Sequence, residues 1–319
     1  MCRHGVIAVM AGVVLMGYGA AVGVAPDERV EQLAVEIRQR DSLERRERAL
    51  ERVREMLGQD AAAQETAMMA LTRTGDIRYD RAGLADAVVP LLQSPAAQVR
   101  GAALLALPTV SDDPLHIDAA AALASDPDPQ VRAGVMRSIV FLRQATKIET
   151  PVHEPALTLL SDADEDVVVG TAQSLWSVPL APEVEAKVIE LSRFGQDQAP
   201  SHSSVPYRMM YFVLSTRPRL SEPVAQRLAE IARHPKLDGN WTGRAVWGLA
   251  RAAEPAAADD VTKALIDELD HSLVHYNRQW AVRGLMSVKT DAATRKLAEV
   301  AEQDESEELR QLAARALPR

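Results

Sequence analysis

Two histidines, His271 and His275, are the side chains with the clearest potential for chemistry, because Asp267 and Asp270 lie close to them in the sequence. On one continuous helix, His271, His275 and Asp267 would share a face, and imidazole and carboxylate groups are typical metal ligands. The segment from Asp270 to Leu273, however, is expected to be a turn between helices, which would break that alignment. We therefore predict solvent-exposed histidines and no metal site.

A run of four acidic residues, Asp162, Asp164, Glu165 and Asp166, is similar to the start of a calcium-binding loop. The run lacks the glycine and the later glutamate that such a loop needs. The sequence also contains no nucleophile elbow and no Walker lysine loop, and its only cysteine, Cys2, excludes a cysteine-based zinc cluster. We therefore predict no catalytic residue, no cofactor and a protein that is not an enzyme.

The composition favours a folded, acidic protein. Of the 319 residues, 47% are hydrophobic and only 4% are aromatic, and 45 acidic against 36 basic residues give a net charge of −9. This much apolar material excludes global disorder. An acidic chain is a poor candidate for binding phosphate backbones, so we expect no nucleic-acid partner.

The first 25 residues differ from the rest of the chain. Arg3 precedes the stretch 5–25, which contains no charged residue and is rich in small side chains near its end. This pattern predicts a secretory signal peptide, and an uncleaved membrane anchor is the alternative. Both interpretations export the remainder to the periplasm or the cell exterior. Membrane contact is expected only through residues 1–25, if they are retained.

The feature that organises the chain is a repeat with steps of 32 to 38 residues. Each copy has a stripe of mostly apolar or small residues at a first position and at the positions four and eight later, which predicts one face of a helix. The first positions are Ala63, Val99, Val131, Val167, Val205, Trp241, Asn277 and Leu309. A second helix is predicted before most copies, for example at 84–92, 117–124, 183–194, 223–233, 261–269 and 292–301.

One such hairpin cannot bury its apolar stripe alone, so neighbouring hairpins must stack. The predicted fold is all-α, a right-handed α-α superhelix of about eight helical hairpins over residues 59–319. Residues 26–58 differ from the repeats, with one amphipathic helix marked by Val30, Leu33 and Ile37 and another marked by Val53 and Leu57. We predict that they cap the array, and a coiled-coil partner helix is the alternative.

The segment from Asp128 to Val135, with its relatives at 95–103 and 309–314, resembles a HEAT repeat of the short bacterial type related to phycobilin-lyase HEAT-like repeats. The resemblance implies an ARM/HEAT-like solenoid, in which the acid caps the second helix of a repeat and the arginine after the first position packs between repeats. It gives the acidic run at 162–166 a capping role. Val168, Pro206 and Thr242 replace the arginine in the middle copies, which predicts that the row of arginines between repeats is interrupted there.

Large side chains gather in the third quarter of the array, where seven of the 12 aromatic residues lie between positions 207 and 280. Positions two and six after each first residue are expected to face away from the core, on the concave side of the stack, and position three is expected to flank them. These positions predict a partner-binding set of rings and arginines, and gap filling between irregular repeats is the alternative. The set is Tyr207, Arg208, Tyr211, Arg244, Trp247, Trp280 and Arg283.

These observations favour a non-enzymatic, exported scaffold that binds another protein through its concave surface. The resemblance implies one alternative, a tetrapyrrole-handling enzyme similar to bilin lyases. A HEAT-like hydroxylase would need several His-Glu pairs, and His153-Glu154 is the only one in the sequence. A HEAT-like DNA glycosylase is a further alternative, which the acidity and the export segment disfavour.

Overall fold

The protein is all-helical. The computed structural model describes residues 28–38, 42–74, 83–195, 200–217, 219–234, 237, 239–251 and 258–317. Over these ranges it contains seventeen α-helices and no β-strand, which confirms the predicted all-α, solenoid-like fold class. The proposed export segment, residues 1–25, lies outside the described residues. In the described ranges, no helix combines the length and the apolar character needed to cross a bilayer.

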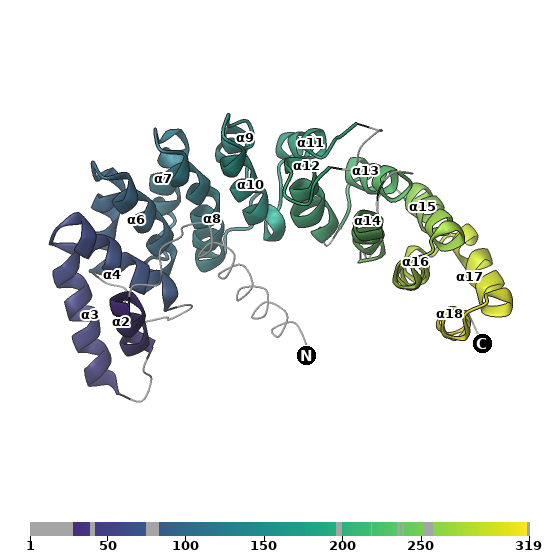
Figure 1. Cartoon of the computed structure of the whole chain (residues 1–319), viewed down its shortest axis with the longest axis horizontal. Coiled ribbons are helices and arrows are strands. Elements are labelled where there is room, and N and C mark those ends of the chain that lie inside the picture. The colour runs from purple at the N-terminus through teal and green to yellow at the C-terminus, as the bar shows by residue number, and fades with distance from the viewer. Residues whose placement is uncertain are drawn as a thin grey trace. The chain divides into compact units, whose positions relative to one another are not determined.

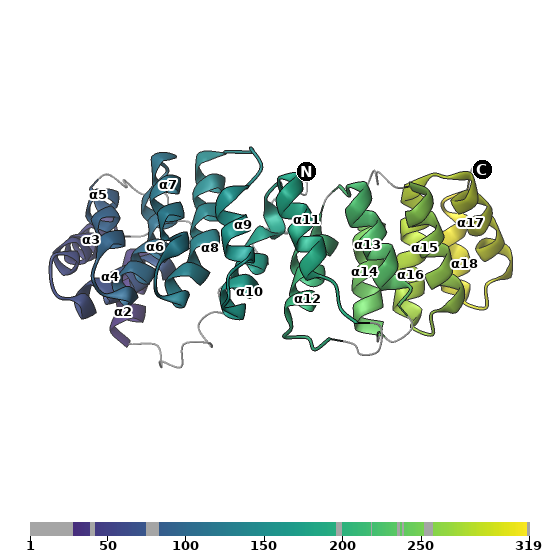
Figure 2. The same ribbon diagram turned by 90° about the horizontal axis from the view of Figure 1, so that it is seen from above.

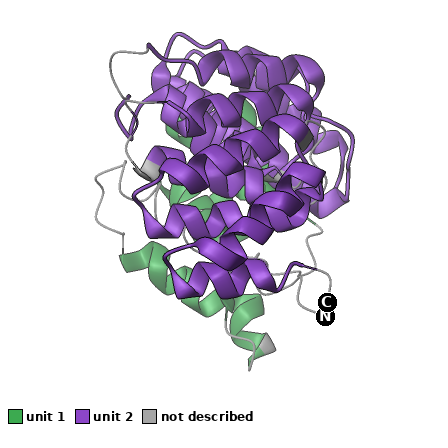
Figure 3. Ribbon diagram, turned by 90° about the vertical axis from the view of Figure 1, so that its right-hand side faces the viewer, with its two compact units in different colours: residues 1–111 green, residues 112–319 purple. Residues whose placement is uncertain are grey.

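The chain divides into two compact units, Met1–Ser111 and Asp112–Arg319 (Figure 3). The boundary falls inside the stretch over which the sequence predicts repeats. The first unit contains α2 (Glu28–Arg38), α3 (Leu43–Leu57), α4 (Ala61–Arg73), α5 (Leu84–Val88), the 3-10 helix η1 (Val89–Gln93) and α6 (Ala97–Val110). In this unit α2, α3 and α4 pack on one another, and α6 packs on α4.

Burial in the first unit follows the predicted pattern. Val30, Leu33 and Ile37 of α2 are buried, as is the α6 stripe of Val99, Ala103 and Leu107. The two helices predicted in residues 26–58 are therefore present, with their apolar faces covered. Whether they act as a cap stays a prediction.

The second unit is a row of six hairpins over its described residues. They are α7 (Leu115–Ala121) and η2 (Ala122–Ser125) with α8 (Pro129–Thr146); α9 (Glu154–Leu160) with α10 (Glu165–Ser174) and η3 (Leu175–Ser177); α11 (Pro182–Leu191) with α12 (Val205–Arg208), η4 (Met209–Val213) and η5 (Leu214–Thr216); α13 (Glu222–Ala232) with α14 (Gly239–Arg251); α15 (Ala258–His271) with α16 (His275–Val288); and α17 (Asp291–Gln303) with α18 (Glu307–Ala314).

The hairpins of the second unit form two layers (Figures 1 and 2). The first helices α9, α11, α13, α15 and α17 contact one another in order, and so do the second helices from α8 to α18. Figure 1 shows the second helices on the inner, concave side of this unit. The predicted stripe lies between the layers, since Leu175 and Leu249 are 0% exposed and Leu285 is 1% exposed.

Small residues in the stripe helices permit this close packing. A Cβ atom added to Gly248 of α14 would lie 2.8 Å from the Cα atom of Ser215 and 3.2 Å from Cδ1 of Leu228. At Gly284 of α16, a Cβ atom would lie 2.6 Å from Cδ1 of Leu265. All three distances are shorter than ordinary van der Waals contact, so neighbouring helices approach at a spacing that excludes a methyl group.

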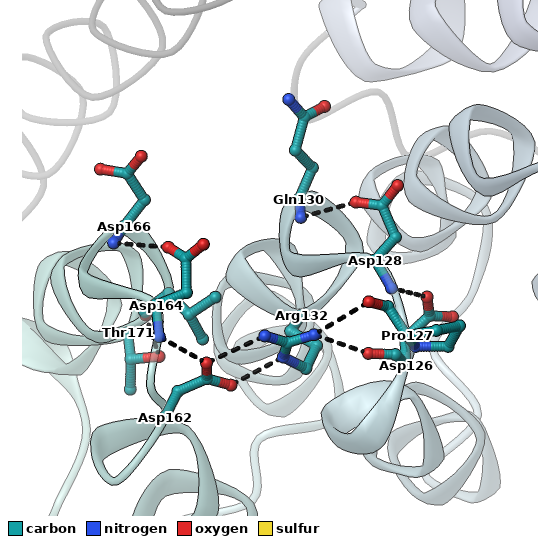
Figure 4. A network of polar contacts seen from close by, with 10 residues as sticks. Asp126, Pro127, Asp128, Gln130, Arg132, Asp162, Asp164, Asp166 and Thr171 are labelled. Atoms are coloured by element: carbon teal, nitrogen blue, oxygen red, sulfur yellow. Dashed lines mark hydrogen bonds and ion pairs between the residues drawn. The ribbon is translucent and has the colours of Figure 1, made fainter.

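Polar contacts link hairpins at their turns (Figure 4). Arg132 of α8 donates two hydrogen bonds to the carboxylate of Asp162, at 2.7 and 2.9 Å, and one to the carbonyl oxygen of Asp126 at 2.8 Å. Asp162 also accepts a hydrogen bond from the backbone N–H of Asp164, whose own side chain caps α10. The acidic run therefore forms a helix-capping turn, as expected from the resemblance. Arg278 and Asp304 repeat the pairing at 2.6 Å.

The polar contacts between hairpins change in the middle of the second unit, where Val168, Pro206 and Thr242 stand in place of the arginine. There Arg217, only 7% exposed, donates hydrogen bonds to the backbone carbonyls of Leu175, Val178 and Val213. Burial lowers the pKa of Arg217 to about 10, so the guanidinium stays charged at neutral pH. A buried cation held by carbonyl oxygens thus joins these central hairpins.

The first prediction concerns the Arg132–Asp162 pair. Hydrogen bonds from Arg132 hold the pKa of Asp162 below its usual value. The resulting stabilisation is fully present above the unfolded pKa of about 4 and is lost as the pH falls through the lower folded pKa. We expect Asp162→Asn to lower the free energy of unfolding at pH 7 by about 1–3 kcal/mol, measured by urea denaturation, with the difference shrinking as the pH falls below about 4.

Asp118→Asn is the control, because Asp118 is an exposed acid of α7. If the two variants lost equal stability, the loss in Asp162→Asn would come from removal of a surface charge and not from breaking the Arg132–Asp162 pair.

The second prediction concerns helix spacing. Gly248→Ala should raise helix propensity by about 1 kcal/mol, yet the new methyl group meets the backbone of Ser215. We expect a net loss of about 1–3 kcal/mol in the free energy of unfolding. Gly195→Ala is the control, because a Cβ atom there meets nothing within 4 Å. A Gly248→Ala variant that is more stable than the wild type would contradict the close approach of α14 to η5.

Candidate functional site

The segment that carries Tyr207 and Tyr211 is an irregular helix. It begins as α12, widens into the π-helical turn η4 and ends as the 3-10 helix η5. The carbonyl oxygen of Tyr211 accepts hydrogen bonds from Oγ of Ser215 at 2.9 Å and from Nη2 of Arg244 at 3.3 Å. Single π-helical turns inside α-helices are frequent at functional sites.

Arg244 of α14 lies at the centre of the site. Its Nε atom donates a hydrogen bond to Oγ of Ser215 at 3.0 Å. Its Cζ atom lies 4.2 Å from the ring centre of Tyr211 and 4.0 Å from that of Trp247. The guanidinium thus contacts two aromatic rings from neighbouring hairpins while two hydrogen bonds fix its orientation.

Burial is the main cause that lowers the pKa of Arg244, and the positive charge of Arg251 lowers it further. Arg251 lies against the same ring, with its Cζ atom 4.6 Å from the centre of Trp247. Two like charges therefore meet at one indole.

Further rings extend the site onto α16. The ring centres of Trp247 and Trp280 are 6.3 Å apart, and those of Trp280 and Tyr276 are 5.8 Å apart, both edge to face. Arg283 lies over Trp280 at 5.1 Å. We call this continuous set of contacts the aromatic–arginine ladder; it consists of Tyr211, Arg244, Trp247, Arg251, Tyr276, Trp280 and Arg283.

The ladder is partly open to solvent. Tyr276 is 61% exposed, Arg251 and Arg283 are exposed, and Tyr211, Arg244, Trp247 and Trp280 are half-buried. The structure thus brings five of the seven predicted residues into one contiguous set, contributed by three consecutive second helices.

Tyr207 corrects the sequence-based expectation. It was predicted to face outward, but it is only 7% exposed, so that prediction is wrong. Its ring packs edge to face against Trp241 at 4.9 Å and stacks on Tyr211 at 5.3 Å. The first position of the next repeat carries the large indole of Trp241, and Tyr207 is buried because its ring packs against this indole. Arg208, also predicted in the set, lies over Phe212 at 5.6 Å instead.

Sequence reasoning missed Arg251 and Tyr276. Arg251 follows Trp247 by four residues and Tyr276 precedes Trp280 by four, so each shares a helix face with a predicted residue. This spacing is the available signal, although neither residue stands at position two, three or six of its repeat.

The two histidines lie where the sequence places them. Helix α15 ends at His271 and α16 begins at His275, so the predicted break between them is confirmed. Nδ1 of His271 is 2.9 Å from the carbonyl oxygen of Asp267, and Nε2 of His275 is 3.2 Å from Oε2 of Glu308. Within the described ranges, no group of three or more histidine, cysteine, aspartate or glutamate side chains is placed to hold a metal ion.

Comparisons with known proteins bear only on the fold. No family model and no curated protein matches the sequence. Among solved structures, an engineered protein is similar over 90% of this chain and 87% of its own, with 18% identity and a TM-score of 0.47. Human deoxyhypusine hydroxylase in complex with glycerol is similar over 91% and 94%, with 17% identity and a TM-score of 0.33. A second engineered protein has 16% identity and a TM-score of 0.28.

The third prediction separates the buried ring from the exposed one. Tyr207→Ala removes a ring that Trp241 and Tyr211 cover, so we expect a loss of about 3–5 kcal/mol in the free energy of unfolding. Tyr276→Ala removes a mostly exposed ring and should cost less than about 1 kcal/mol. Thermal and urea unfolding measure both values. Equal losses in the two variants would contradict this assignment of burial.

Proposed function

We propose that this protein is a non-enzymatic, HEAT-type scaffold that is exported from the cytoplasm and binds another protein through the inner side of its second unit. The observation that carries the proposal is the aromatic–arginine ladder, which η4, α14 and α16 build together. Its residues recur at equivalent repeat positions, with Tyr211, Trp247 and Arg283 six residues after their first positions.

The composition of the ladder suits protein recognition. Large rings and arginines supply much of the binding energy in protein interfaces, where the rings bury much surface with few rotatable bonds and arginine adds directed hydrogen-bond donors. The hydrogen bonds that fix Arg244 to Ser215 and to Tyr211 order this side chain before any partner arrives. Such pre-organisation lowers the entropic cost of binding.

The chemistry of the ladder favours binding over catalysis. Ser215, whose hydroxyl contacts the ladder at Arg244, donates its hydrogen bond to the carbonyl of Tyr211 and accepts one from Arg244. Neither contact is with a base, so the hydroxyl is not activated as a nucleophile. The ladder otherwise offers aromatic ring faces and guanidinium N–H donors, which are typical of a surface that recognises another protein.

The export part of the proposal rests on the uncharged stretch at residues 5–25, after Arg3. It places the partner in the periplasm or outside the cell. Mass measurement of the N-terminus of the mature protein tests this part independently of the binding surface.

The fourth prediction tests partner binding. We expect the Tyr211→Ala plus Trp247→Ala variant to lose capture of its partner from an envelope fraction, quantified by mass spectrometry against the wild type. Both rings are half-buried, so the variant should stay helical and lose only a few kcal/mol of stability, about 1–3.

Phe141→Ala is the matched control, because Phe141 is an aromatic residue of α8 that is 39% exposed and lies outside the ladder. Capture that survives in the ladder variant, or that is lost equally in the control, contradicts the proposal. A shift in the absorbance spectrum of an added bilin would instead favour the tetrapyrrole-handling alternative.

A further inference from the structure

We propose that the ladder binds an extended, acidic segment of the partner protein, with carboxylates at Arg244 and Arg251 and apolar side chains at the neighbouring α15–α16 turn. This inference rests on the proposed function and adds the chemistry of the partner. Two independent features of the second unit support it: positive charge that no carboxylate of the described residues pairs with, at one end of the ladder, and exposed apolar side chains at the other.

The positive charge at the ladder has no carboxylate partner within the described residues. Among the described residues, Arg244 contacts a hydroxyl, a carbonyl and two rings, while Arg251 and Arg283 lie on ring faces. By contrast, Arg132 and Arg278, which link neighbouring hairpins, each pair with a carboxylate of a turn. In a chain with nine more acidic than basic residues, three arginines that pair with no carboxylate of the described residues form a local patch of opposite sign on two adjacent helices.

Desolvation of Arg244 and its repulsion from Arg251 both cost free energy, which favours binding of an anionic ligand. Arg244 is partly desolvated and lies beside a second cation, and both effects lower its pKa. A carboxylate bound beside Arg244 and Arg251 would offset the repulsion and accept hydrogen bonds from guanidinium N–H groups that meet no other acceptor among the described residues. Arginine matches a carboxylate better than lysine does, because its planar fork donates two parallel hydrogen bonds.

The apolar end of the surface is the turn between α15 and α16. Leu273 is 101% exposed, Tyr276 is 61% exposed and Val274 is 42% exposed, so three large apolar side chains cluster in solvent within four positions. Tyr276 joins this cluster to the ladder through Trp280. A hydrophobic cluster that is continuous with a cationic one is typical of a surface that binds a partner.

The size of the surface fits a short peptide segment. Steps of 5.8, 6.3 and 4.0 Å lead from the Tyr276 ring through Trp280 and Trp247 to the Arg244 guanidinium, so the two ends lie within about 16 Å. An extended chain covers this distance with about five residues. The segment therefore needs an apolar residue at one end and acidic residues about five positions away.

The experiment uses the full chain and a fluorescein-labelled peptide with two leucines at one end and three aspartates at the other, read by fluorescence anisotropy. The matched peptide carries asparagine in place of each aspartate. We expect the acidic peptide to bind at least about tenfold more tightly, and this preference to shrink between about 50 and about 300 mM salt.

Two variants test the two ends separately. Arg251→Gln should weaken binding of the acidic peptide about tenfold and remove most of the preference over the asparagine peptide. Leu273→Ser should weaken both peptides equally, by about fivefold, without loss of stability, because the side chain is fully exposed. Arg295→Gln is the charge control, since Arg295 is an exposed residue of α17 in the other layer.

Equal binding of the two peptides, no detectable binding of the acidic peptide at about millimolar concentration, or equal effects of the ladder variant and Arg295→Gln would overturn the inference. Tighter binding of an oligothymidine than of the acidic peptide would also overturn it. In each of these cases, the proposed function would still hold if partner capture depended on Tyr211 and Trp247. Loss of that dependence is the separate outcome that contradicts the function itself.

Discussion

Each hairpin in this chain carries an apolar stripe on its second helix that the hairpin cannot cover by itself, and the rest of the structure depends on how neighbouring hairpins cover it. The stripe residues Leu175, Leu249 and Leu285 are essentially inaccessible to water, and the glycines beside them allow helices to approach more closely than a methyl group permits. Stability in such an array comes from contacts between adjacent repeats. Because the stripe faces the other layer, the opposite side of the second helices is left free to carry a recognition surface.

The polar connections between hairpins change along the second unit, and the candidate site lies where they change. Arg132 and Arg278 pair with the acid of the following turn, whereas the central hairpins rely on Arg217 and backbone carbonyls. In the same region, the π-helical turn η4 presents the carbonyl of Tyr211 to Arg244. A departure from the regular repeat thus creates a fixed guanidinium between two rings, which a regular array would not provide.

The sequence predicted the fold well because the stripe has a simple period, and burial at positions zero, four and eight follows directly from helix geometry. It also located most of the ladder. It failed at Tyr207, because the direction of that ring depends on Trp241, which lies 34 residues later in the chain. It did not find the partners of Arg217, because backbone carbonyls 39 and 42 residues away leave no mark on side-chain patterns. Arg251 and Tyr276 were missed although their i, i+4 spacing to the predicted tryptophans was available.

Hydrogen exchange of the intact protein, followed by mass spectrometry, tests the central claim most directly. If hairpins are stabilised by their neighbours, the amides of α10, α14 and α16, which have a second helix on either side, should exchange slowly. Within the described residues, α18 packs against α16 alone among the second helices, so its amides should exchange clearly faster. Equal protection of α18 and α14 would contradict the account, because each hairpin would then be stable without support from the next.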